Sequence, residues 1–138
     1  MGNTLQGLGR LDEAEVSYKQ SIALKPDYAE AHSNLGATLQ ELRRLEEAEA
    51  SYRQAIVLKP DYAEAHYNLG LTLKELGRLD EAEASHKKAI DLKHDFRKAN
   101  AGLGNVLMLK GQHKEGLEQL RLGNGAIIFE IDNWVVIQ

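Results

Sequence analysis

The side chains best able to do chemistry in this 138-residue chain are its five histidines and its many carboxylates. A metal site on one helix needs two ligands three or four residues apart, and no two histidines have that spacing. His32 and His66 instead recur at equivalent places of a repeated sequence, which indicates a structural role. The absence of cysteine excludes disulfides, thiolate ligands and thiol nucleophiles. The sequence therefore predicts no metal and no cofactor.

The carboxylates gather in short acidic segments, of which Glu46, Glu47 and Glu49 form one and Asp-Glu-Ala-Glu sequences form the others. Lys or Arg stands about one helical turn away, so these segments predict solvated ion pairs of about 0.2–0.5 kcal/mol each. They do not indicate a catalytic carboxylate pair. The serines lack a supporting His and Asp motif, and Gly-Asn-Gly at 123–125 lacks the Lys-Ser/Thr of a phosphate loop. We therefore expect a protein that is not an enzyme.

Charge and hydropathy argue against two further classes of partner. The chain has 17 basic and 21 acidic residues, a formal net charge of −4, and its basic residues are scattered rather than clustered. This balance is unfavourable for binding nucleic acid. No apolar run approaches the roughly 20 residues that span a bilayer, and the first ten residues are too polar for a signal peptide. We expect a cytoplasmic protein with no nucleic-acid or membrane partner.

A period of 34 residues dominates the sequence. Residues 29–62 and 63–96 are identical at 23 of 34 positions, and residues 1–28 match 35–62 at 19 of 28 positions. A looser copy covers 97–123, after which the composition changes. The predicted organisation is thus a repeat array over 1–123, beginning with a partial repeat at 1–28, followed by a separate segment at 124–138.

Each repeat has the pattern of two antiparallel helices. In the third repeat the apolar spacing predicts a first helix over about 63–76, and in the second repeat it predicts a second helix from Leu45 to Leu58. A break at Arg43-Arg44 separates the two helices, and Gly9 and Gly77 stand at the same break in neighbouring repeats. Pro26 and Pro60 end the second helices because proline lacks the backbone donor. Small residues, Gly36 and Gly70 with Ala48 and Ala82, indicate where the two helices approach closely.

These residues resemble the tetratricopeptide repeat family, whose pattern is matched in the second repeat by His32, Leu35-Gly36, Leu39, Ala48, Tyr52 and Pro60. The resemblance extends to about residue 123 and implies an all-α, right-handed solenoid of about 3.5 helical hairpins. In the fourth repeat Gly116 and Leu120 replace the small methyl and the aromatic residue. We expect its second helix to be short and weakly held.

The resemblance implies that the first helices line a concave groove that binds a protein or peptide. Positions that are unchanged between the two complete repeats would grip any peptide, and changed positions would select the partner. The expected groove residues are Asn34, Asn68, Tyr67, Leu71, Lys74, Glu30, Glu64, Gln40, Asn3 and Asn105.

Asn34 and Asn68 are the sharpest candidates, because a carboxamide can both donate to and accept from a peptide bond. Their phase resembles the asparagine ladder of O-linked N-acetylglucosamine transferase, although Gly102 takes that phase in the fourth repeat. The alternative is that both are solvated residues copied by duplication. Asn3 and Asn34 also fit the pattern of adaptors that bind a chaperone's terminal carboxylate, but the cations of that pattern are missing, which argues against this function.

The fourth repeat and the following segment depart from this polar pattern. Met108 and Leu109 replace polar residues of the groove and predict either an apolar binding spot or a place where the following segment docks. Residues 124–138 contain two β-branched and aromatic runs around Asp132-Asn133, which predict a β-hairpin-like tail. This tail would cap its own array, pair with another copy or begin a further domain.

The sequence therefore predicts a non-catalytic interaction scaffold that binds a protein or peptide segment in the concave groove. Two alternatives stay open. The array could be the substrate-recruiting segment of a larger enzyme of the glycosyltransferase or oxygenase type, as similar arrays in the family are. It could also be a structural module that forms homo-oligomers through the 124–138 tail.

Overall fold

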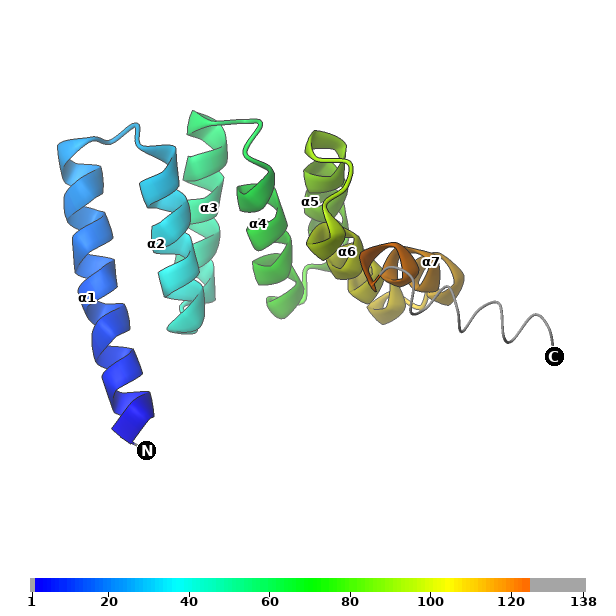
Figure 1. Cartoon of the computed structure of the whole chain (residues 1–138), viewed down its shortest axis with the longest axis horizontal. Coiled ribbons are helices and arrows are strands. Elements are labelled where there is room, and N and C mark those ends of the chain that lie inside the picture. The colour runs from blue at the N-terminus through cyan, green and yellow to red at the C-terminus, as the bar shows by residue number, and fades with distance from the viewer. Residues whose placement is uncertain (1, 125–138) are drawn as a thin grey trace.

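A computed structural model of the chain describes residues 2–124, and the side chains from residue 7 onward. These residues form seven α-helices and no strand: α1 (Gly2–Leu24), α2 (Ala29–Glu41), α3 (Leu45–Leu58), α4 (Ala63–Glu75), α5 (Leu79–Leu92), α6 (Arg97–Leu109) and α7 (His113–Asn124). The helices follow one another in a row, with α1 at one end and α6 and α7 at the other (Figure 1). The predicted all-α helical-repeat fold is confirmed over this range. The predicted β-hairpin lies outside the described residues, apart from Asn124, which is helical.

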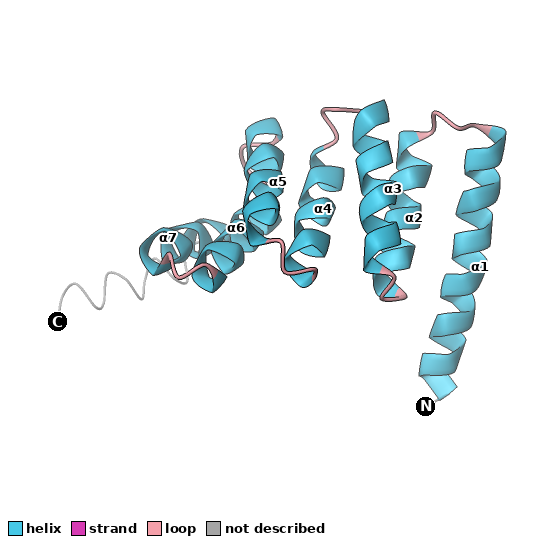
Figure 2. Ribbon diagram, turned by 180° about the vertical axis from the view of Figure 1, so that it is seen from behind, coloured by secondary structure: helices cyan, strands magenta, loops and turns pink. Residues whose placement is uncertain are grey.

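Successive helices run antiparallel and are joined by short loops that lie alternately at one and the other end of the helices (Figure 2). The helix predicted over 63–76 is α4, and the one predicted from Leu45 to Leu58 is α3. The loops that contain Pro26 and Pro60 are held by a contact that the sequence does not predict. The imidazole Nε2–H of His32 donates to the carbonyl oxygen of Pro26 at 3.0 Å, and His66 donates to Pro60 at the same distance. Each of these histidines thus ties the first helix of its repeat to the preceding loop.

The tight turn between the two helices of a repeat requires a left-handed residue. Gly77 has a φ of 80° and Gly111 a φ of 83° in the turns after α4 and α6. Arg43 has the same conformation after α2, with a φ of 65°. The left-handed backbone conformation is unfavourable by roughly 1–2 kcal/mol for a residue with a Cβ, whereas glycine adopts it freely. The second repeat therefore keeps an arginine at a position that favours glycine.

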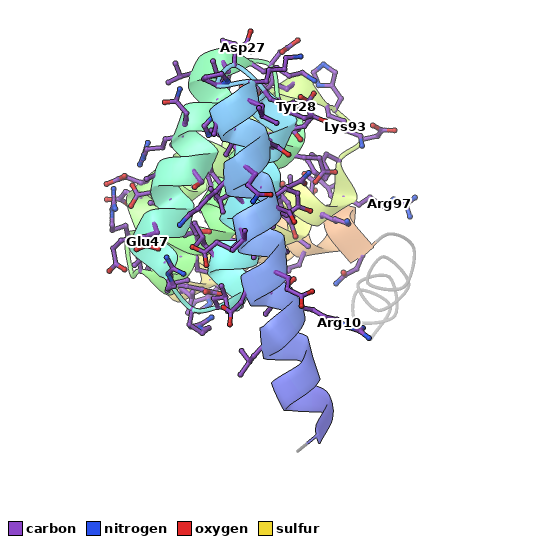
Figure 3. All side chains as sticks on the ribbon, turned by 90° about the vertical axis from the view of Figure 1, so that its left-hand side faces the viewer. Arg10, Asp27, Tyr28, Glu47, Lys93 and Arg97 are labelled. Carbon is purple, nitrogen blue, oxygen red and sulfur yellow. The ribbon has the colours of Figure 1, made fainter. Side chains whose placement is uncertain are left out.

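The turn predicted at Gly9 is wrong. Residues Gly2–Leu24 form one continuous helix, and Gly9 is not among the described residues with positive φ. The N-terminal end of α1 projects beyond the other helices (Figures 1 and 3). A Cβ added at Gly7 or Gly9 would meet no atom within 4 Å. Since no described atom packs against this part of the helix, a continuous α1 satisfies its backbone hydrogen bonds without a turn.

An aromatic ring from each complete second helix packs into the space left by glycine. A Cβ built on Gly36 would lie 2.8 Å from ring atoms of Tyr52, so the glycine makes room for this ring. His86 takes the same role in the next repeat and lies between two glycines: added Cβ atoms would be 2.6 Å away at Gly70 and 2.7 Å away at Gly102. Two of the small residues that the sequence analysis assigned to close helix contact, Gly36 and Gly70, thus accommodate side-chain rings.

His86 is fully buried and differs from Tyr52 in its polar contacts. The Tyr52 hydroxyl donates to Oε1 of Gln40 at 2.9 Å, whereas neither ring nitrogen of His86 has a hydrogen-bond partner among the described residues. Burial, followed by the nearby Lys74 ammonium, lowers the pKa of His86 to about 4. The neutral imidazole is therefore the form compatible with the packed array.

A ladder of ion pairs joins each second helix to the turn of the following repeat. Arg44 lies 2.8 Å from Glu15, Arg78 lies 2.6 Å from Glu49, and Lys110 lies 2.7 Å from Glu83. Each of these glutamates also pairs with a cation one turn along its own helix: Lys19, Arg53 or Lys87. The acidic segments are therefore more than a solvated face, because their last glutamate bridges two repeats.

The fourth repeat is held by close backbone approach. A Cβ on Gly104 would lie 2.8 Å from the carbonyl oxygen of Gly116, and one on Gly123 would lie 2.7 Å from the nitrogen of Ala101. Among the described residues of α7 Gly116 alone is buried, whereas α3 buries Ala48, Tyr52 and Ala55. Less side-chain surface therefore holds this helix, as expected for a weakly held one, and its predicted short length stays a prediction.

Two glycines of equivalent sequence position should respond oppositely to alanine. Gly9→Ala should raise the free energy of unfolding by up to about 1 kcal/mol, because the site is helical and open. Gly77→Ala should lower it by about 1–2 kcal/mol, because its φ of 80° is unfavourable for alanine. Urea denaturation of both variants measures the two changes. A loss of stability in Gly9→Ala would mean that a turn forms there.

His86 should make the array sensitive to mild acid. The pKa of His86 is lowered from 6.5 to about 4 in the folded chain, so protonation favours the unfolded state and stability falls as pH drops from 6.5 towards 4. Between pH 7 and pH 5 the loss from this residue should be on the order of 2 kcal/mol. His86→Phe should remove that part of the pH dependence. Denaturation of both proteins at the two pH values is the measurement, and equal losses would contradict the assignment to His86.

Candidate functional site

The first helices of the repeats lie on one side of the array. Helix α4 contacts both α2 and α6, so these three helices form a continuous surface. Seen from the α1 end, Glu47 of α3 and Arg97 of α6 lie on opposite sides of the row (Figure 3). We call the side formed by α2, α4 and α6 the groove face. It contains the residues that the sequence analysis assigned to partner binding.

The groove face contains a hollow of about 590 Å³ between the C-terminal halves of α2 and α4. Helix α1 contributes one lining residue, α3 contributes Tyr52, and the turn after α2 contributes Arg43. Two of the predicted groove residues, Gln40 and Asn68, meet here. The complete lining is Leu11, Ala37, Gln40, Glu41, Arg43, Tyr52, Asn68 and Glu75.

The two asparagines are placed on neighbouring helices, and their side chains are accessible. Asn34 is exposed on α2, and Asn68 is half-buried in the hollow on α4. The hydroxyls of Thr38 and Thr72 donate to the backbone carbonyl oxygens of these asparagines at 3.0 Å. These hydrogen bonds do not involve the side-chain carboxamides. A segment lying across α2 and α4 could therefore meet both amides.

The asparagine series ends at α6 for a steric reason. Gly102 has the equivalent position on α6, where a Cβ would lie 2.7 Å from Cε1 of His86. An asparagine there would require the His86 ring to move. Asn105, the other expected amide of α6, is exposed. Asn3 lies in α1, in the part of the chain for which the structure describes the backbone alone.

Gln40 and Tyr67 are engaged by the array itself. The Gln40 side chain accepts the hydrogen bond from Tyr52 and thereby positions the phenol in the hollow. The ring of Tyr67 lies 5.6 Å from His86 and 5.3 Å from Phe96, measured between ring centroids. Burial, with a smaller contribution from the Glu64 carboxylate, raises the pKa of Tyr67. Tyr67 thus acts partly as a packing residue between α4, α5 and α6.

The other expected residues are accessible to different degrees. Leu71 and Lys74 are half-buried on α4, whereas Glu30 and Glu64 are exposed near the N-terminal ends of α2 and α4. Glu30 lies 3.7 Å from the ammonium of Lys59, a long ion pair between exposed groups. These residues extend the groove face beyond the hollow.

Met108 and Leu109 differ in their surroundings. A Cβ on Gly116 would lie 2.9 Å from the sulfur of Met108, so Met108 covers the glycine of α7 and is half-buried. Leu109 is 62% exposed, and Leu117 and Leu122 of α7 are exposed as well. Met108 therefore has a packing role, and Leu109 belongs to an exposed apolar end of the described array.

The most informative residue of the hollow was not among the predicted site residues. Nη1 of Arg43 donates to Oε2 of Glu75 at 2.8 Å, joining the turn after α2 to the end of α4. The signal in the sequence was the replacement of glycine by arginine at this turn, since Gly77 occupies it in the next repeat. A polar residue kept in a strained conformation is a recognised mark of functional sites.

Acidic groups dominate the hollow. Within residues 7–124, Glu41 forms no ion pair, and Glu75 pairs with Arg43 alone. Burial raises the pKa of the Tyr52 hydroxyl, and the carboxylates of Glu41 and Glu75 raise it further. Both carboxylates thus act on the same phenol, which places them around one small volume.

The described residues contain no cluster of possible metal ligands. Among them, no group of three or more His, Asp or Glu side chains could hold a metal ion.

Within residues 2–124, none of the helices has the length and apolar character required to cross a bilayer.

Comparison with known proteins relates the fold to solved structures. A crystal structure of MamA is 29% identical, with a TM-score of 0.79, over 88% of this chain and 71% of that chain. MamA 41-end from Desulfovibrio magneticus RS-1 is 25% identical, with a TM-score of 0.77, over 96% of this chain and 72% of that chain. No curated protein matches the sequence.

The repeat assignment comes from family models. A model described as TPR repeat matches residues 2–43 and 41–77, which together exceed half of the chain. A second model, described as tetratricopeptide repeat, matches residues 63–96. These matches confirm the resemblance drawn from the sequence and indicate a non-enzymatic protein-interaction module. The chain is a member of the tetratricopeptide repeat family.

Proposed function

We propose that this protein is a scaffold that binds an extended peptide or protein segment along the groove face of α2, α4 and α6. The observation that supports this most directly is the hollow between α2 and α4, where Asn68, Gln40 and Tyr52 surround an open volume of about 590 Å³. Such a depression with convergent polar groups on rigid helices suits a side chain of a bound segment.

Asn34 and Asn68 would bind the backbone of that segment. Each carboxamide offers two donors and one acceptor oxygen, so it can engage a peptide unit whatever side chain that unit has. They lie on neighbouring first helices at the same helical phase, and a third amide is excluded at Gly102 by the His86 ring. The proposed backbone contacts are therefore limited to a short stretch of the partner.

The other functions expected from the sequence stay predictions, as does the cytoplasmic location. Recruitment of a substrate to an attached enzyme depends on sequence outside this chain. Homo-oligomer formation through the tail depends on residues 125–138, which lie outside the described range. The exposed apolar side chains of Leu109, Leu117 and Leu122 mark a second surface at the α6–α7 end, at which either kind of contact could begin.

Replacing both groove amides should weaken the retention of a partner without unfolding the array. The chain and its Asn34→Ala, Asn68→Ala variant are immobilised, and the host proteins that each retains are quantified by mass spectrometry. We expect at least one partner to fall by about tenfold or more in the variant, equivalent to about 1.4 kcal/mol.

A matched control comes from the opposite side of the array. Gln54→Ala removes an exposed carboxamide from α3, and partner retention should stay unchanged. Circular dichroism melting of all three proteins checks that the helices are intact. Equal retention by the wild-type chain and the groove variant would refute the proposed function of the groove face.

A further inference from the structure

We propose that the groove face selects a basic peptide, whose lysine or arginine side chain enters the hollow beside Glu41 and Glu75. This inference rests on the proposed function and specifies the chemistry of the partner. It is carried by the geometry of the hollow and by the charges along the two helices that flank it.

The hollow presents two carboxylates at equivalent positions of neighbouring repeats. Glu41 ends α2 and Glu75 ends α4, and both line the same open volume. Glu41 is exposed and has no ion-pair partner within residues 7–124. A cation of a bound peptide would therefore gain a partner without displacing any described side chain.

The remaining walls suit the aliphatic stem of a long basic side chain. Leu11 and Ala37 supply apolar surface, and Tyr52 is fixed in the hollow by its hydrogen bond to Gln40. Lysine and arginine bury their methylene groups on apolar surface while keeping the charged end near water or a counter-ion. The hollow offers both environments side by side.

Arg43 supports the proposal that a basic side chain enters the hollow, because its own guanidinium already binds the Glu75 carboxylate as the cation of a ligand would. Its guanidinium is 2.8 Å from Glu75, and its side chain is 68% exposed. The residue keeps a left-handed backbone at a turn where Gly77 stands in the next repeat. An internal cation that can leave Glu75 at little cost would compete with the peptide and tune its affinity.

The charges at the hollow favour the same kind of partner. Glu41 and Glu75 line it with Arg43 as the one cation among its lining residues, whereas the other cations of the groove face lie outside the hollow, Lys74 on α4 and Arg97 and Lys98 at the start of α6. At the hollow an acidic side chain would meet like charges, whereas a basic one would be attracted. The occupant is accordingly a peptide with at least one Lys or Arg and few acidic residues.

Three defined peptide mixtures test the inference. Each is a fluorescein-labelled nonapeptide mixture with Ala, Gly, Ser and Asn at all positions except the central one, which is Arg, Glu or Leu. Fluorescence anisotropy measures their binding to the wild-type chain at low and at physiological ionic strength. We expect the Arg mixture to bind about tenfold more tightly than the Glu mixture.

Charge variants locate the effect in the hollow. Glu41→Gln keeps the shape of the side chain and should remove most of the preference for Arg. Arg43→Gly should strengthen binding of the Arg mixture, because Glu75 loses its internal partner while glycine satisfies the turn. Glu46→Gln, an exposed position of α3 outside the groove face, is the matched control and should change neither value.

Failure of this inference can be told apart from failure of the proposed function. If all three mixtures bind equally and Asn34→Ala, Asn68→Ala abolishes binding, the groove binds peptides and the charge selection is refuted. If the preference for Arg survives Glu41→Gln combined with Glu75→Gln, the hollow is not its source. If no mixture binds the wild-type chain, both the peptide-binding groove and its charge selection are refuted.

Discussion

The array depends on the insertion of one ring from each of the second helices α3 and α5 against glycines of the first helices. A single helical hairpin cannot bury its own apolar face, so each repeat needs its neighbour. Tyr52 fills the space over Gly36, and His86 fills the space between Gly70 and Gly102, which belong to successive repeats. A ring packed on both sides fixes the distance between those repeats, and the positions of the other residues on the groove face follow from it.

The same packing explains why the two complete repeats are not equivalent in function. Tyr52 directs its hydroxyl to Gln40 and becomes part of the hollow, whereas His86 has no polar partner among the described residues. His86 also occupies the space that an amide at position 102 would need. One ring therefore completes the candidate site and the other ends the amide series, although both stand at the same place in the repeat.

Electrostatic contacts link the repeats on two separate sides. On one side three glutamates bridge consecutive repeats: Glu15 pairs with Arg44, Glu49 with Arg78 and Glu83 with Lys110. Hydrogen bonds from these cations and from cations of the glutamates' own helices lower the pKa values of Glu15 and Glu83. On the groove face the corresponding link is the pair of Arg43 and Glu75. The ion pairs of the three bridging glutamates repeat with the sequence period and are structural. The pair of Arg43 and Glu75 occurs at one junction between repeats, where the sequence departs from its own period.

The sequence by itself determined the helical hairpins of the complete repeats and the family, because a 34-residue period and apolar spacing are local properties that duplication repeats. It also identified Asn34, Asn68 and Gln40 as residues of one face, since helical phase can be read from spacing. It was wrong at Gly9, where a glycine that marks a turn in a complete repeat is helical, and no described atom packs against the site to favour a turn.

Only the tertiary structure decided which side chains meet. Leu11, Tyr52 and Glu75 are far apart in the sequence and come together in the hollow because three repeats pack side by side. The tertiary contacts also show that Tyr67 and Met108 pack against neighbouring helices, whereas Leu109 is exposed. Spacing within one helix shows the face on which a residue lies, but the neighbour that faces it depends on the distance and angle between helices, which packed rings and glycines set.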